Sequence, residues 1–184
     1  WVLTTACREV RDKSADLSLS VNISPVEFKA SDIVLRVKAI LAKTGFDASR
    51  LELEVTENAT LSKPENALKI MQQLKSLGVR LLMDDFGTGL ATFDYLKSFP
   101  FDYLKIDGSF VKALPHSPVD QAIVQSITQV ARTMGLATIA EFVENEEIIQ
   151  ILREFNVDYG QGYALGKPCT LHQLLSSTDN SATP

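Results

Sequence analysis

Acidic and amide side chains, and one lysine, recur at the ends of short apolar segments of this sequence. Residues at the ends of strands commonly form functional sites. The candidates are Asn22, Glu54, Glu57, Asp84, Asp85, Lys105, Asp107, Glu141 and Gln161. Carboxylates gathered in one half-buried site raise each other's pKa and destabilise a fold unless a cation compensates them. Oxygen ligands without a convergent His or Cys select Mg²⁺, Mn²⁺ or Ca²⁺ over zinc. These residue types therefore predict a site for divalent cations.

The adjacent pair Asp84 and Asp85 indicates more than one ion. Successive strand residues point to opposite faces, so both carboxylates reach one site only where the strand ends and bends. The residues that follow, FGTG at 86–89, favour such a bend. Two carboxylates placed in this way can each face a different metal of a two-ion centre, whose usual separation is about 3.5 to 4 Å.

Lys105 and Asp107 are two residues apart and therefore share one face of their strand, a pairing that keeps the ammonium charged. Such a lysine suits an anionic group or a metal-bound water, and phosphoryl chemistry fits two hard cations best. Glu57 follows Glu54 by three, which favours a supporting hydrogen bond to the loop after Asp85 over metal contact. For any one of these carboxylates, a solvated surface position or a helix N-cap is the alternative.

The elements that position these residues alternate regularly. Apolar segments predict strands over 17–24, 51–57, 79–85, 102–107, 136–142 and 157–163. One helical pattern begins at residue 2, and others follow N-caps at Ser31, Ser62, Ser117 and Thr170. Further helical patterns cover 93–98 and 146–155. Gly45, Gly78 and Gly135 end three of these helices. The alternation predicts a parallel sheet covered by helices.

Two parallel architectures compete, an open doubly wound sheet and a TIM-like (β/α)8 barrel. Chemically capable residues at six successive strand ends favour the barrel, because an open sheet concentrates them at one switch point. About six βα units do not close a barrel of about 250 residues, and the helical spacing already present at residue 2 indicates a chain that begins inside a helix. We therefore expect a C-terminal three-quarters of a domain. We expect residues 1–176 to form this domain and 177–184 to be a disordered tail.

Composition limits the functional classes. Of the 184 residues, 45% are hydrophobic and 22% charged, which excludes disordered and fibrous chains. A net charge of −5 argues against binding a DNA or RNA polymer, and the absence of a long apolar segment argues against direct membrane contact. Cys7 and Cys169 lack metal-type spacing, which predicts free, mostly buried thiols and a cytoplasmic location.

The motifs SVNISPVEF, LELEVTE, MDDFGTGLATFDYLKSFPFDYLKIDGSFV, TIAEFVE and DYGQGYALGKP resemble the EAL domain family of cyclic-di-GMP phosphodiesterases. The resemblance covers nearly the whole chain. It implies a TIM-like barrel with a reversed first strand, and hydrolysis of cyclic-di-GMP to linear pGpG with two Mg²⁺ or Mn²⁺ ions. It further implies a role in bacterial signal transduction, in the cytoplasm or tethered to the inner membrane. It also implies upstream regulatory or GGDEF-type domains and allows a homodimer.

The resemblance also assigns roles to individual residues. Asn22, Glu54 and Asp84 match metal ligands, and Asp85 matches a ligand of the second metal. Asp107 and Glu141 match second-metal or water-activating positions, with Glu141 as the general base. Lys105 matches a lysine near the attacking water, Glu57 a loop-stabilising glutamate, and Gln161 a substrate-binding glutamine.

The chain departs from the family pattern at two places. Phe142 stands where the family usually has Gly, and the Glu-Ala-Leu segment with its metal-binding Glu would precede residue 1. Two other functions remain open, the first because of the missing Glu and the second from the barrel chemistry alone. One is a catalytically inactive cyclic-di-GMP receptor; the other is a metal-assisted enzyme that abstracts a proton from a carboxylate substrate.

Overall fold

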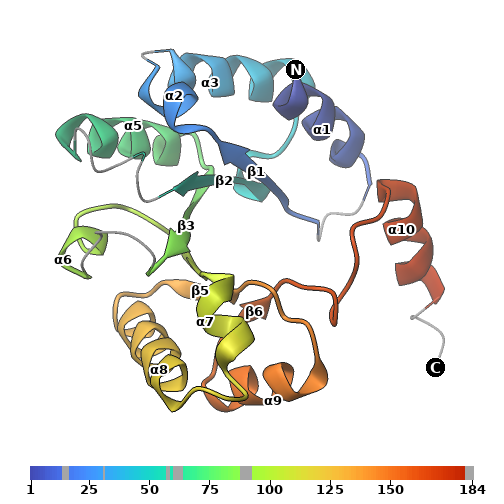
Figure 1. The fold of residues 1–184 in the computed structure, drawn as a ribbon. Helices are drawn as coiled ribbons and strands as arrows, with labels where there is room; N and C mark the ends of the chain where they lie inside the picture. The colour runs from blue at the N-terminus through green and yellow to red at the C-terminus, as the bar shows by residue number, and fades with distance from the viewer. Residues whose placement is uncertain (14–16, 31, 57–58, 60–63, 88–92, 181–184) are drawn as a thin grey trace.

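Six parallel strands form one curled sheet in the computed structural model, which describes residues 1–13, 17–30, 32–56, 59, 64–87 and 93–180 (Figure 1). The strands are β1 (Leu19–Ile23), β2 (Leu51–Thr56), β3 (Arg80–Phe86), β4 (Tyr103–Ile106), β5 (Ala137–Ala140) and β6 (Tyr159–Gly160). Their spatial order is their chain order. A doubly wound sheet reverses its strand order at a switch point, so the described part of the chain is an arc of a TIM-like barrel, as predicted.

Helices connect the strands and cover the outside of the curl (Figure 1). They are α1 (Val2–Arg11), α2 (Pro25–Lys29), α3 (Ile33–Thr44), the 3-10 turn η1 (Ala48–Arg50), α5 (Pro64–Ser76), α6 (Phe93–Leu96), α7 (Gly108–Ala113), α8 (Pro118–Thr133), α9 (Glu146–Glu154) and α10 (Leu171–Asn180). The repeated strand-helix unit places all six strands parallel and their carboxyl ends at one edge.

The two faces of the sheet differ in polarity, as the alternating sequence LELEV illustrates. Leu51, Leu53 and Val55 are fully buried in the core between sheet and helices. Glu52 and Glu54 point the other way, to the inner face of the curl, because strand side chains alternate. The outer face therefore holds the fold together, and the inner face is free to carry polar groups.

Most predicted helix ends agree with the structure. Gly45 has a φ of 67° and ends α3 in the left-handed conformation that favours glycine, and the Ser117 hydroxyl accepts from the Asp120 N–H to begin α8. The predicted cap at Ser31 and the one at Ser62 lie outside the described residues. Instead, Asp32 is the N-cap residue of α3.

Two short helices were not predicted separately. Ser24 caps α2 by accepting from the Glu27 N–H, and Asp107 caps α7 by accepting from the Ser109 N–H. Both follow a strand directly, with the cap in the last polar position of the segment that we assigned to the strand. A short capped helix adds too few apolar positions to be separated from its neighbours by periodicity.

The C-terminal segment differs from the prediction. Helix α10 continues through Asn180, so residues 177–180, expected in a disordered tail, are helical; residues 181–184 lie outside the described residues. The Gln173 N–H donates to the Thr170 hydroxyl, which starts the helix, and no Gly or Pro interrupts it before Pro184. The disordered tail was predicted from polar composition alone, and polar composition does not by itself end a helix.

Both cysteines are free, but only Cys7 is buried; Cys169 is exposed, contrary to expectation, because it lies in the extended segment after β6 rather than in the core. Among the helices within the described ranges, none has the length and apolar character needed to span a bilayer.

Candidate active site

Lys105 lies at the centre of the polar cluster on the inner face of the sheet. Its Nζ lies 2.7 Å from Glu54 Oε2, 2.8 Å from Asp84 Oδ1 and 2.7 Å from Glu141 Oε1. The three carboxylates come from or directly follow β2, β3 and β5, and the lysine comes from β4 between them. Only 4% of Lys105 is exposed. Four consecutive strands therefore bring one ammonium and three carboxylates together.

The sheet bends at Asp85, as the sequence predicted. The register of β3 against β4 shifts between Met83 and Phe86, and Asp85 has a φ of 57°, in the left-handed region. Asp84 is consequently buried while Asp85 is exposed, yet both reach the same cluster. Carboxylate oxygens of Asp84, Asp85 and Glu141 lie within 4.8 Å of one another.

The electrostatics of the cluster is unbalanced. Glu54, Asp84, Asp85 and Glu141 supply four carboxylates against the single ammonium of Lys105. Burial raises the pKa of Glu141, and Asp84 and Asp85 raise it further, against the opposing effect of Lys105. Burial and the charges of Asp84 and Asp107 likewise raise the pKa of Asp85.

The pKa of Lys105 moves in the direction that keeps it charged. Burial alone would lower the pKa of its ammonium, but its contacts with Asp84, Glu141 and Glu54 outweigh burial and raise it. Lys105 is therefore a fixed positive charge that offsets only part of the negative charge around it.

The donor set fits a hard divalent cation. Asp84 Oδ1 is buried without a hydrogen-bond partner; it lies at ion-pair distance from Lys105, but not in hydrogen-bond geometry. A buried carboxylate oxygen left without a hydrogen bond is costly unless another positive group approaches it. The cluster offers only oxygen ligands, which Mg²⁺ and Mn²⁺ prefer.

The remaining predicted residues lie around this cluster. Asn22 pairs in register with Glu54 on the neighbouring strand and is exposed. The Gln161 N–H donates to the Ala140 carbonyl, and Gln161 lines a pocket of about 310 Å³ together with Glu141. Glu57 lies outside the described residues.

Asp107 differs from the expectation that it would pair with Lys105. Its Oδ1 accepts hydrogen bonds from the Ser109 N–H and hydroxyl, because β4 ends at Ile106 and Asp107 is the N-cap of α7. It still acts on the cluster, since its charge contributes to the raised pKa of Asp85.

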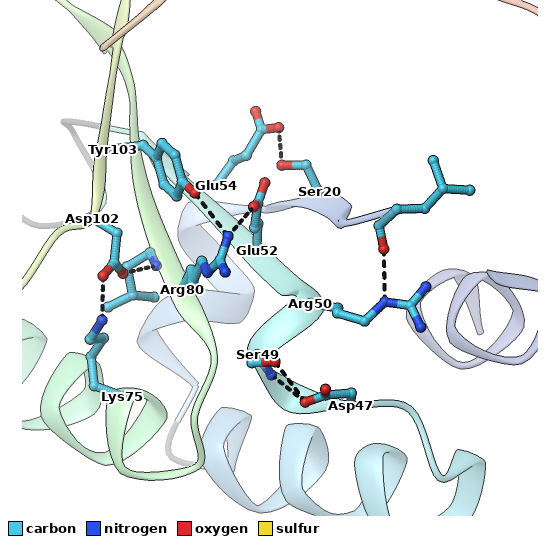
Figure 2. A network of polar contacts seen from close by, with 12 residues as sticks. Ser20, Asp47, Ser49, Arg50, Glu52, Glu54, Lys75, Arg80, Asp102 and Tyr103 are labelled. Atoms are coloured by element: carbon cyan, nitrogen blue, oxygen red, sulfur yellow. Dashed lines mark hydrogen bonds and ion pairs between the residues drawn. The ribbon is translucent and has the colours of Figure 1, made fainter. Parts of the chain in front are cut away.

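Sequence reasoning missed Ser20. Its hydroxyl donates to Glu54 Oε1 at 2.5 Å (Figure 2). Lys105 donates to Oε2, so both oxygens of Glu54 are held. The signal was available, because Ser20 precedes Asn22 by two and therefore points to the same face of β1.

A second polar network lies at the amino ends of the strands (Figure 2). Arg80 donates to the Tyr103 hydroxyl at 2.9 Å and pairs with Glu52 at 3.4 Å. Asp102 accepts from the Leu81 N–H at 2.8 Å and pairs with Lys75. Asp158 accepts from the Thr138 N–H in the same way as Asp102 accepts from the Leu81 N–H, also at 2.8 Å. Both aspartates precede a tyrosine in the sequence, but Asp-Tyr also occurs at 94–95, so the dipeptide alone does not identify this pair.

Fold and site together define a TIM-barrel-like α/β domain with an acidic, oxygen-only site at the carboxyl ends of its strands. Comparison with known proteins identifies the family. The EAL domain matches residues 1–168. The cyclic di-GMP phosphodiesterase PdeA of Borreliella burgdorferi is 40% identical over 170 residues, which are 91% of this chain and 25% of PdeA.

Solved structures agree. The PaMucR phosphodiesterase in complex with c-di-GMP superposes with a TM-score of 0.90 at 38% identity, over 95% of this chain and 72% of that one. The EAL domain of Mycobacterium smegmatis DcpA superposes with a TM-score of 0.92 at 33% identity, over 100% of this chain and 85% of that one. The chain belongs to the EAL domain family. It spans about a fifth to a quarter of the length of the curated relatives that it matches.

Proposed function

We propose that this chain hydrolyses cyclic di-GMP to linear pGpG with the aid of Mg²⁺ or Mn²⁺. The main observation behind this proposal is the cluster around Lys105, in which buried carboxylates outnumber the ammonium and Asp84 Oδ1 lacks a hydrogen bond. Relatives named as cyclic di-GMP phosphodiesterases, and a related phosphodiesterase solved with c-di-GMP, support this substrate.

Six side chains are proposed to hold the cations. Asn22, Glu54 and Asp84 serve one ion, and Asp85, Asp107 and Glu141 serve the second. Bound there, two divalent ions supply Lewis acidity toward the phosphate and the attacking water. The place of these residues at or beside one edge of the sheet supports a shared cation site, and oxygens of Asp84, Asp85 and Glu141 lie within 4.8 Å of one another.

The residues of the chain are then assigned the proton transfers. Water attacks phosphorus, a carboxylate oxygen of Glu141 or Asp107 takes its proton, and the bond from phosphorus to the 3′-oxygen breaks. The same carboxyl group then returns the proton to the 3′-oxygen, which leaves as a hydroxyl. In the metal-free cluster burial raises the pKa of Glu141, a direction that favours proton uptake by this carboxylate. Lys105 keeps Glu54, Asp84 and Glu141 oriented and faces the anionic phosphate, and Gln161 contacts the substrate from its pocket.

The setting is proposed with the activity. The chain acts in bacterial second-messenger signalling in the cytoplasm, with regulatory or GGDEF-type domains upstream and a homodimer as its assembly. The bifunctional diguanylate cyclase/cyclic di-GMP phosphodiesterase MucR of Pseudomonas aeruginosa, 38% identical over 181 residues, supports the link to a cyclase domain.

Turnover of cyclic di-GMP in Mn²⁺ or Mg²⁺ tests the proposal. We expect a product heavier than the substrate by one water, and loss of that product when EDTA removes the metal. Tight binding of cyclic di-GMP without product at any enzyme concentration would contradict hydrolysis and support a receptor. Release of a proton from a carboxylic acid in a small panel, without action on cyclic di-GMP, would contradict both.

A further inference from the structure

Phe142 has an unusual backbone conformation directly after Glu141. Its φ is 53°, in the left-handed region that bulky residues rarely adopt. Asp85, on the other side of the cluster, shares this conformation with a φ of 57°. Such a conformation is unfavourable and persists only where surrounding contacts enforce it. The turn after β5 is therefore held by something other than its local preference.

The contact that holds it is the ring of Phe142 on Gly108. A Cβ built on Gly108 would lie 2.0 Å from Cδ2 of Phe142, so only glycine leaves room for the ring. Lys112 covers the ring as well, with its Nζ 4.0 Å from the ring centroid. Lys112 also pairs with Glu144 at 3.7 Å. These contacts attach the turn after β5 to α7, whose N-cap is Asp107.

Helix α7 is attached in the same way to the turn after β3. A Cβ on Gly87 would lie 2.8 Å from Cε2 of Phe110, so that ring packs closely on the residue that follows Asp85 and Phe86. One short helix thus begins at Asp107 and carries close aromatic contacts to the turns that bear Asp85 and Glu141. The relative placement of three acidic side chains depends on these contacts.

We infer that Phe142 is a positioning residue, whose ring on Gly108 holds Glu141 beside Asp84 and Asp85 in the arrangement that binds the divalent cation. The inference rests on the proposed metal-dependent hydrolysis and deepens it. Half of Phe142 is exposed, at 50%, so a simple core role does not account for a strained backbone at this position. Positioning does, because strain at a site persists when a specific contact requires it.

The test compares Mn²⁺ affinity, measured by isothermal titration, in Phe142→Gly, Phe142→Tyr and Asn156→Gly. Phe142→Gly relaxes the backbone and removes the ring, and we expect Mn²⁺ affinity to fall about 10- to 100-fold, as for other residues that orient metal ligands. Phe142→Tyr keeps the ring and should retain the affinity. Asn156 has a φ of 58° at the end of α9, so Asn156→Gly is a control for the backbone change alone; it should bind Mn²⁺ like the wild type.

Turnover separates positioning from substrate contact. We expect Phe142→Gly to lower kcat at subsaturating Mn²⁺ and to recover when Mn²⁺ is raised. A higher KM for cyclic di-GMP with unchanged kcat and Mn²⁺ affinity would overturn the inference, because the ring would then contact substrate. Unchanged Mn²⁺ affinity in Phe142→Gly would also overturn it.

A second pair of variants covers the case in which Phe142→Gly does not fold. Phe142→Leu keeps a Cβ and loses the ring, and Gly108→Ala displaces the ring from its seat; both should weaken Mn²⁺ binding. Wild-type protein that neither binds Mn²⁺ nor forms product would refute the proposed function itself. Wild-type protein that does both, with variants that match it, would refute only the role of Phe142.

Discussion

The two ends of the sheet carry similar numbers of charged groups but treat them differently. At the carboxyl ends, four carboxylates surround one buried ammonium, and one buried oxygen lacks a hydrogen bond. At the amino ends, Arg80 and Asp102 each have a partner or a backbone N–H to bind (Figure 2), and Asp158 binds the Thr138 N–H. In TIM-like barrels the first end carries chemistry and the second carries stability. The contrast in charge compensation agrees with the function proposed for the carboxyl ends of this chain.

Replacing Lys105 by Met should have the largest effect of any change at either end. It leaves Glu54, Asp84 and Glu141 buried without their shared ammonium, and breaking a buried ion pair typically costs about 3 to 5 kcal/mol. We expect the free energy of unfolding in urea to fall by about that amount and turnover to vanish. Lys75→Met is the matched control at the amino ends. Its partner Asp102 is partly exposed, so a loss of about 1 kcal/mol or less, with normal turnover, is expected.

Asp84→Asn should separate function from stability. The side chain keeps its shape and the cluster loses one negative charge, so we expect little change in the free energy of unfolding. Turnover of cyclic di-GMP should fall on the order of 10²- to 10³-fold, because a group that stabilises the transition state electrostatically is lost. Steady-state kinetics and urea denaturation of one preparation measure both. A stability loss as large as the Lys105→Met loss would show that the carboxyl ends are structural.

The metal-free protein should lose stability as pH rises. Burial raises the folded-state pKa of Glu141 and of Asp85 above the unfolded values, so between the unfolded and folded pKa the folded state binds more protons. The free energy of unfolding therefore decreases as pH increases through that window. Mn²⁺ at 100 times its Kd should restore about 2.7 kcal/mol above the window. Urea denaturation from pH 4 to 8, with EDTA or with Mn²⁺, measures both effects; a profile that rises with pH in EDTA would contradict the charge imbalance.

Asp102→Ala at the amino ends should cost stability without affecting turnover. It removes the ion pair with Lys75 and leaves the Leu81 N–H without its carboxylate, which costs about 1 to 3 kcal/mol for a buried backbone group. Asp158→Ala should behave alike, because Asp158 binds the Thr138 N–H in the same way. A marked fall in kcat for either variant would mean that the two ends are coupled.

The parts of the fold that could be predicted are those with strong periodicity. The six strands and the long helices alternate in the sequence. Carboxylates near the carboxyl ends of strands, such as Asp84, or directly after them, such as Glu141, meet at one edge of a parallel sheet. The bend at Asp85 was predictable from its neighbours in the sequence, because Gly87 follows it by two residues. The match to the EAL domain agrees with the predicted fold.

The packing between strand ends could not be predicted. Asp107 is two residues from Lys105, yet β4 ends between them and Asp107 caps α7, so spacing within a strand no longer applied. The partners of Lys105 come from three other strands, and no local pattern specifies which carboxylates lie within 3 Å of an ammonium. The contact of Phe142 with Gly108 joins residues 34 positions apart and depends on a backbone conformation that the sequence does not favour.

Tyr103→Phe tests the amino-end network at its smallest scale. Arg80 loses the hydroxyl that accepts its hydrogen bond at 2.9 Å but keeps Glu52, and the ring contact of Tyr103 with Tyr159, with centroids 6.1 Å apart, remains. The loss should be about 1 kcal/mol or less, the net value of one hydrogen bond, with turnover unchanged. In Asp102→Ala the buried N–H loses its acceptor, whereas in Tyr103→Phe the guanidinium of Arg80 retains one. The difference between the two variants in urea denaturation therefore measures the cost of an uncompensated polar group at this end of the sheet, the kind of cost that we expect cations to relieve at the other.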